Sequence, residues 1–201
     1  MSGIVGSINT RGSGITNLGS AADGNVFTGT GAGLPVGFEA AAGGGKVLQV
    51  VSTAKTDTFG STSPVTPEDV TGMSVTITPS ATSSKVLLTV SVAYSGSTDN
   101  DSYFRILRGS TAIAIGDAAG SRTRCWFELP RSHSTGNVMS GADSLTFLDS
   151  PATTSATTYK LQVGGHADTA QMYVNRNVND SDSAGGTGRG ISTITAMEIG
   201  V

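Results

Sequence analysis

The chain has 201 residues, 28 of them glycine, with 13% charged residues, 5% aromatic residues and a formal net charge of −3. No apolar run approaches the ~18 residues of a membrane-spanning helix, and the amino terminus lacks the basic start of a secretory signal, so we expect no membrane insertion. A nucleic-acid binder needs a basic face, which this acidic balance with scattered arginines and lysines argues against.

Few side chains are suited to redox or metal chemistry. Cys125 is the single cysteine, so an internal disulfide is excluded. His133 and His166 are the two histidines, too few for a Cys/His metal cluster. Because Cys125 lies in an apolar run, we interpret it as a small buried hydrophobe rather than a nucleophile. We expect no cofactor and no metal.

The first 45 residues differ in composition from the rest of the chain. They hold almost half of the glycines and only three charged residues, which is too little apolar surface for a compact domain. Large apolar side chains nevertheless recur through them, which is unusual for a plain linker. We therefore predict an extended arm, residues 1–45, that lies along a partner surface and is anchored by Ile4, Val5, Ile8, Ile15, Leu18, Val26, Phe27, Leu34, Val36 and Phe38.

From residue 46 onward, short apolar runs alternate with turn signals. The clearest run is 85–94, where every second residue from Val86 to Tyr94 belongs to one largely apolar face, a period typical of a half-buried strand. Turns are predicted at 79–84, at Gly109-Ser110 and at 149–155, and a long loop at 175–190. Further strands are predicted at 46–53, 73–78, 103–108, 111–115, 125–129, 144–148, 157–163, 171–174 and 191–199.

These elements determine the expected fold class. Helix signals are almost absent, because no long apolar stripe has a helical period and strong helix formers are scarce. Nine or ten short antiparallel strands with turns between them are typical of a β-sandwich or jelly roll. We predict an all-β chain with the extended Gly-rich arm at 1–45 and an antiparallel β-sandwich, jelly-roll-like domain at 46–201.

Residues 17–39 contain an Asp-Gly turn, a Thr-Gly-x-Gly turn and then an aromatic residue followed by Glu. This order resembles a segment of bacteriophage tail-fibre proteins. Ala21, Ala22 and Phe27 depart from the usual pattern, and Phe38 stands where tryptophan is usual. The matching residues are Gly19, Asp23, Gly24, Val26, Gly31, Gly33, Phe38 and Glu39.

The remaining chain carries a second set of motifs. They are KVLQVV at 46–51, VTGMSVTITP at 70–79, SSKVL at 83–87, RGST at 108–111, LDSPATTSATTY at 148–159 and ITAMEI at 194–199. This set is similar to one that recurs in virion proteins of bacteriophages, especially marine and freshwater phages. The resemblance covers most of the chain and implies a virion location and a homotrimer.

Enzymatic sites have little support in the sequence. His133 lies in a polar run without a nucleophile-elbow motif, and the carboxylates fall mainly in turns with no motif that pairs them. We therefore expect no enzyme. The loops with Asp99 and Asp101, and with Asp180 and Asp182, each offer two of the six to eight oxygens that Ca²⁺ takes, and whether they bind a cation stays open at this point.

A few side chains are candidates for contacts with a receptor or a neighbouring subunit. Arg122 and Arg124 lie two residues apart and would share one face of a strand, where they pair with Glu128 or Asp117 or contact an acidic partner. Aromatic residues in β-sandwiches more often belong to the core, but an aromatic platform is also how glycans are bound. The candidates are Tyr94, Tyr103, Arg122, Arg124 and Trp126.

These observations lead to one functional hypothesis and two alternatives. The hypothesis is a non-enzymatic phage virion structural protein, a trimeric surface fibre or spike docked on tail or capsid proteins through its arm. The first alternative is a cement protein that decorates and strengthens the capsid. The second is a glycan-binding module that recognises a host surface and does not need an apolar arm.

Overall fold

The computed structural model describes residues 25–28, 37–40, 45–97, 102–129, 138–166, 170–185 and 187–200. The chain divides into two units between Gly44 and Gly45, one residue from the expected boundary. In the first unit, strand β1 (Asn25–Thr28) pairs antiparallel with β2 (Gly37–Ala40), a pairing that the sequence analysis did not predict. Of the proposed anchoring residues, Ile4, Val5, Ile8, Ile15, Leu18, Leu34 and Val36 lie outside the described residues.

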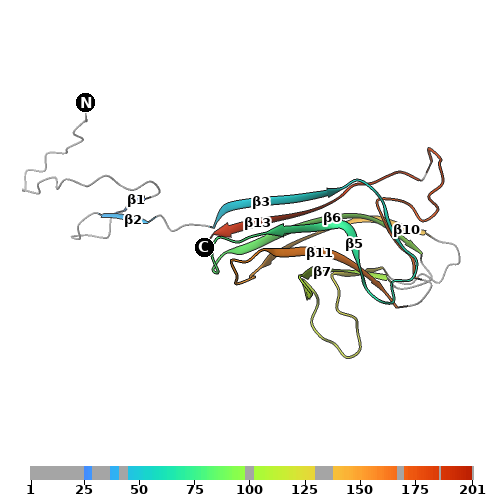
Figure 1. Ribbon diagram of the computed structural model, residues 1–201, viewed down its shortest axis with the longest axis horizontal. Coiled ribbons are helices and arrows are strands. Elements are labelled where there is room, and N and C mark those ends of the chain that lie inside the picture. Colours follow the sequence, from blue (N-terminus) through green and yellow to red (C-terminus); the bar gives the residue numbers. More distant parts are fainter. Residues whose placement is uncertain are drawn as a thin grey trace, which may run out of the picture. The chain divides into compact units, whose positions relative to one another are not determined.

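The second unit is built of strands, and the described residues contain no helix, which confirms the all-β prediction. Its strands form an antiparallel β-sandwich (Figure 1). They are β3 (Lys46–Lys55), β4 (Phe59–Ser61), β5 (Glu68–Ile77), β6 (Lys85–Ser97), β7 (Ser102–Arg108), β8 (Thr111–Ile113), β9 (Phe127–Leu129), β10 (Val138–Asp149), β11 (Thr157–Gly165), β12 (Met172–Val174) and β13 (Ser192–Gly200).

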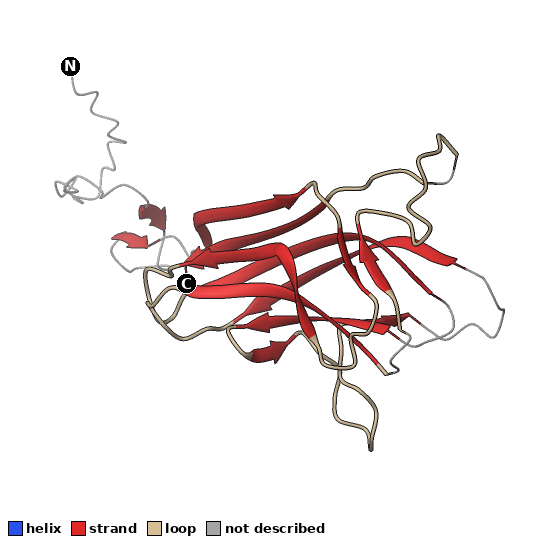
Figure 2. Cartoon of the chain, turned by 45° about the vertical axis from the view of Figure 1, so that its right-hand side comes forward, coloured by secondary structure: helices blue, strands red, loops and turns tan. Residues whose placement is uncertain are grey.

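Strand β6 is the centre of the six-stranded sheet. On one side it pairs with β10 along nearly its whole length. On the other it pairs first with β13 and then with β12. Beyond these lie β3, which pairs with β13, and β4, which pairs with β12. The second sheet has the order β5-β11-β7, with β8 and β9 paired to β7, and Figure 2 shows the strands of the two sheets as separate layers.

The hydrophobic core lies between the two sheets. Alternate residues of β6 from Val86 to Val92 are fully buried, as their period of two predicted. They share one cluster with Tyr159 and Leu161 of β11 and with Phe104 of β7. Burying a side chain of this kind stabilises a fold by about 1.5–3 kcal/mol, so the cluster holds the sheets together. Tyr94, predicted on the same face, is only partly buried and packs against the cluster.

Several strands differ from the sequence prediction. β10 begins at Val138 rather than 144, because its pairing with β6 continues through residues of low strand propensity. β5 begins at Glu68 rather than 73, because Gly72 adopts a φ of 80° in a bulge, so that Val70 and Met73 both face the core. Strand β4 was not predicted at all.

The segment between β8 and β9 corrects another prediction. Arg122 and Arg124 lie in a loop, not on a strand, and β9 begins only at Phe127. Arg122 donates to the carbonyl of Ala119 at 3.2 Å, and Nε of Arg124 donates to that of Gly116 at 2.6 Å. Within the described residues neither arginine forms the expected ion pair with Glu128 or Asp117. The loop projects away from the sandwich (Figure 1).

Candidate functional site: an uncharged sheet face and an arginine-lined pocket

One face of the six-stranded sheet points away from the core and carries no charge over three successive rows. We call it the outer face. The strand register places each row across β10, β6, β13 and β3 in turn. The first, apolar row consists of Leu148, Leu87, Met197 and Val50. The middle row consists of Thr146, Thr89, Thr195 and Ser52, and the third row of Ser144, Ser91, Thr193 and Ala54.

The apolar row of the outer face is open to solvent at both of its ends. Leu148 is 53% exposed on β10, and Val50 is 56% exposed on β3. Val47 and Leu48, also on β3, are more than half exposed as well. Contiguous exposed apolar side chains on a soluble domain mark interaction surfaces. β3 is moreover an edge strand of its sheet, a position that soluble proteins normally guard with charges.

Two buried carboxylates lie directly beneath this apolar row. Asp149 follows Leu148 in β10 and accepts hydrogen bonds from Nη1 of Arg108 at 2.8 Å and from the hydroxyl of Tyr159 at 2.7 Å. Arg108 and Tyr159 belong to the other sheet, so this contact joins the two layers. Burial, and secondarily the bond to Asp149, raises the pKa of Tyr159, which keeps its hydroxyl a donor.

Glu198 is the second buried carboxylate and follows Met197 in β13. Its Oε1 accepts three hydrogen bonds: from the backbone N–H of Ser80 at 2.7 Å, from the hydroxyl of Ser80 at 2.6 Å and from that of Ser84 at 2.8 Å. The bond from the Ser80 side chain is the main cause that lowers the pKa of Glu198. Glu198 therefore fixes the predicted turn at 79–84 against the sheet.

The second candidate site lies at the loop between β12 and β13. The loop starts at Asn175, a buried residue with a φ of 62°. Nδ2 of Asn175 donates to the carbonyls of Lys55 and Asp57 at 2.8 and 2.9 Å, and its Oδ1 accepts from Ser192 at 2.7 Å. At the other end of the loop, the N–H of Gly190 donates to the carbonyl of Asn175. The base of the loop is thus closed by hydrogen bonds.

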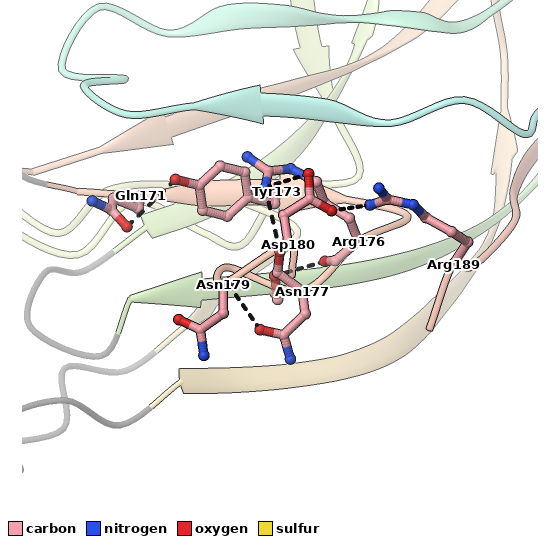
Figure 3. A network of polar contacts seen from close by, with 8 residues as sticks. Gln171, Tyr173, Arg176, Asn177, Asn179, Asp180 and Arg189 are labelled. Carbon is pink, nitrogen blue, oxygen red and sulfur yellow. Dashed lines mark hydrogen bonds and ion pairs between the residues drawn. The ribbon is translucent and has the colours of Figure 1, made fainter. Parts of the chain in front are cut away.

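This loop places two arginines on opposite sides of one carboxylate (Figure 3). Nη1 of Arg176 lies 3.2 Å from Oδ2 of Asp180, and Nη1 of Arg189 pairs with Oδ1 of the same group. The guanidinium of Arg176 also lies over the ring of Tyr173, 3.9 Å from its centroid. Both carboxylate oxygens of Asp180 are already paired with guanidinium groups. This arrangement disfavours the metal-cation site considered for Asp180 and Asp182. Asp99 and Asp101 lie outside the described residues.

The two arginines form part of the wall of a pocket of about 300 Å³. The pocket opens between the loop and the ends of β6 and β10. It is lined by Ala93, Tyr94, Ser140, Gly141, Asn175, Arg176, Asn177, Gly188, Arg189 and Gly190. Arg176 and Arg189 are the two charged residues of this lining, and Asp180 does not belong to it. The sequence analysis missed both arginines, because they lie in a Gly-, Asn- and Asp-rich loop with no motif around them.

The candidate contact residues from the sequence do not form one platform. Tyr94 lines the arginine-lined pocket, and its hydroxyl donates to Asp143 at 2.8 Å. Burial, with this bond, raises the pKa of Tyr94 to about 12. Tyr103 is only 6% exposed and so belongs to the core, and Trp126 is half-buried, with its ring 5.0 Å from that of Phe127.

The remaining reactive groups lie elsewhere. Arg122 lines a second hollow of about 510 Å³ together with Glu128 and His166, which pair with each other at 3.1 Å. Cys125 is half-buried, and burial raises the pKa of its thiol. His133 lies outside the described residues. Within the described ranges no three His, Cys, Asp or Glu side chains converge on a metal position, and no helix has the length and apolarity of a membrane crossing.

Comparison with known proteins gave little further information. No family model and no curated protein matches the chain. Among solved structures, one titled "Structure of infectious bursal disease virus Gx strain" is similar at 13% identity and a TM-score of 0.33. The match covers 86% of this chain and 45% of that one, so this chain spans less than half of its length. A TM-score this low carries no argument about function.

Proposed function

We propose that the chain is a non-enzymatic structural subunit of a phage particle, a trimeric surface fibre or spike that docks through its arm, residues 1–45. The observation that carries the proposal is the outer face, with its exposed apolar row and no charge over three rows. A monomeric surface protein gains nothing from such a face, whereas an assembly subunit needs one.

The occupant of the outer face is a second copy of this chain. An acidic or basic partner would require complementary charges, and the three rows offer none. Around a threefold axis, one part of this uncharged face on one copy would meet another part on the next copy without like-charge repulsion. The hydroxyls of the middle row can satisfy one another, as Ser52 and Thr195 already do at 2.8 Å within one chain. The motifs of residues 46–201 that resemble phage virion proteins support this interpretation and imply three copies.

The arm is the proposed link to the particle. It forms a unit separate from the sandwich, and apolar residues recur along it. Its apolar side chains and backbone hydrogen bonds would bind a partner surface, and three arms per trimer would multiply the affinity by avidity.

Particle incorporation tests this proposal. Chains lacking residues 2–44 and full-length chains are supplied during assembly, and the amount of each on purified particles is measured. We expect the truncated chain to be lost from particles while its thermal melting matches that of the full chain. Incorporation of the truncated chain at full occupancy would contradict docking through the arm.

A further inference from the structure

We propose that the arginine-lined pocket binds a sugar that carries a carboxylate, such as a uronic acid. This inference goes beyond the proposed function, because assembly through the outer face and the arm does not need the pocket. The pocket lies between the β12–β13 loop and the ends of β6 and β10, beyond the last of the three outer-face rows, and none of its lining residues belongs to those rows.

The charge of the lining favours an anion. Its two charged residues are Arg176 and Arg189, and the carboxylate of Asp180 lies between them without lining the pocket. A guanidinium has five N–H donors, and Asp180 engages Arg189 through Nη1. Arg189 therefore keeps donors for a second, planar carboxylate, the geometry that arginine recognises best.

The two arginines differ in how far they are enclosed. The side chain of Arg176 is 18% exposed and is held by the ring of Tyr173 and by Asp180 (Figure 3). The side chain of Arg189 is 55% exposed. Side chains that are already held by Asp180 lower the ordering cost of binding, and the exposed guanidinium of Arg189 is the accessible one.

The rest of the lining fits a sugar. A volume of about 300 Å³ is at the lower end of pockets that hold small molecules. The hydroxyl of Ser140 and the hydroxyl oxygen of Tyr94, whose proton is donated to Asp143, offer partners for ring hydroxyls. Gly188, where a Cβ would meet no atom within 4 Å, lets a ligand approach the backbone closely.

Gly188 gives a clean way to block the pocket. A Cβ at Gly188 would meet no atom within 4 Å, so Gly188→Phe can place a ring in the pocket without displacing a neighbour. Gly185 has the same free space in the same loop but does not line the pocket, so Gly185→Phe is the matched control. Arg189→Gln removes the more exposed of the two cations, and thermal melting shows that each variant is folded.

The experiment is a titration of the full-length chain with glucuronate, glucose and inorganic phosphate, followed by calorimetry or NMR. We expect a Kd of roughly 1 mM for glucuronate, at least about tenfold weaker binding of glucose, and weakening as salt rises. Gly188→Phe and Arg189→Gln should lose at least about tenfold in glucuronate affinity, whereas Gly185→Phe should bind like wild type.

Each of these results would overturn the proposal: no glucuronate binding by wild type, equal binding by Gly188→Phe, or equal affinity for glucuronate and glucose. Phosphate that binds as tightly as glucuronate would reduce the site to a simple anion site and equally overturn it. Because the titration does not measure assembly, its failure leaves the particle-incorporation result unaffected, and the two proposals fail independently.

Discussion

Glu198 and Asp149 show how single residues hold the end of the sandwich that carries the apolar row. Both carboxylates are almost fully buried, at 2% and 6% exposure. A buried charge is tolerated only where hydrogen bonds or ion pairs replace its hydration. Glu198 receives three donors from the turn at 79–84, and Asp149 receives Arg108 and Tyr159 from the other sheet.

Replacing Asp149 should destabilise the fold, because the buried hydroxyl of Tyr159 loses its acceptor and Arg108 keeps a longer bond to the carbonyl of Ser150, at 3.3 Å. We expect Asp149→Ala to lower the free energy of unfolding by about 2–4 kcal/mol, measured by urea denaturation. Asp143→Ala is the control from the same strand. Asp143 is exposed and bonds to Tyr94, so its loss should cost about 1 kcal/mol or less. Equal costs for the two variants would contradict the structural role of Asp149.

Because of Glu198, the free energy of unfolding should decrease as the pH falls into the acid range. Its pKa is lowered on folding from an ordinary value of 4.5, so the unfolded chain takes up this proton first as the pH falls. The stability that the Glu198 carboxylate contributes is fully present above its pKa in the unfolded chain. It is lost as the pH falls through the lower pKa that Glu198 has in the folded protein. Glu198→Gln should therefore destabilise at neutral pH by about 1–2 kcal/mol and show a shallower loss below pH 4.5. Parallel pH profiles of wild type and variant in urea denaturation would contradict this.

At the scale of the element, the loop between β12 and β13 is held in place by the residues at its two ends, Asn175 and Gly190. Asn175 adopts a left-handed φ and uses its side chain to bond to the segment after β3. Gly190 packs so closely against Ala93 that a Cβ would lie 2.8 Å from that of Ala93. Glycine is therefore needed at this end of the loop, and the fixed ends hold Arg176 and Arg189 near each other.

Two substitutions at Asn175 separate its backbone from its side chain. Asn175→Gly keeps the left-handed backbone and loses the side-chain bonds, whereas Asn175→Ala loses both. We expect Asn175→Gly to destabilise by about 2 kcal/mol and Asn175→Ala by about 1 kcal/mol more. Hydrogen exchange of residues 176–190 should quicken in both variants. Unchanged exchange in the loop would show that Asn175 does not anchor it.

The sequence predicted those strands whose alternation of apolar and polar residues matches their burial in the fold. β6 alternates strictly over its first part, so its core face was predicted from Val86 to Val92. The first half of β10 contains Ser140, Gly141 and Asp143, and only pairing with β6 makes it a strand. Of the residues in the two candidate sites, the sequence singled out Tyr94. The two arginines are brought together by the geometry of a loop, and the outer-face rows by strand register, and no local sequence pattern encodes either.

At the scale of the whole molecule, the outer face explains the unusual composition. A chain with 13% charged residues can leave one broad face without charge. The Ser and Thr side chains of that face are compatible both with water and with a neighbouring subunit. In the proposed assembly, the apolar contact that drives association comes from Leu148, Leu87, Met197 and Val50.

The central claim is that copies of this chain associate through the outer face, and light scattering coupled to size-exclusion chromatography tests it most directly. Val50→Lys with Leu148→Lys adds two charges to side chains that are more than half exposed, so folding should be preserved. Val65→Lys changes a 46% exposed side chain outside the three rows and serves as the control. The account predicts three times the 20.2 kDa chain mass for wild type and for the control, and a single chain mass for the double variant. A monomeric wild type, or a double variant that stays trimeric, would contradict it.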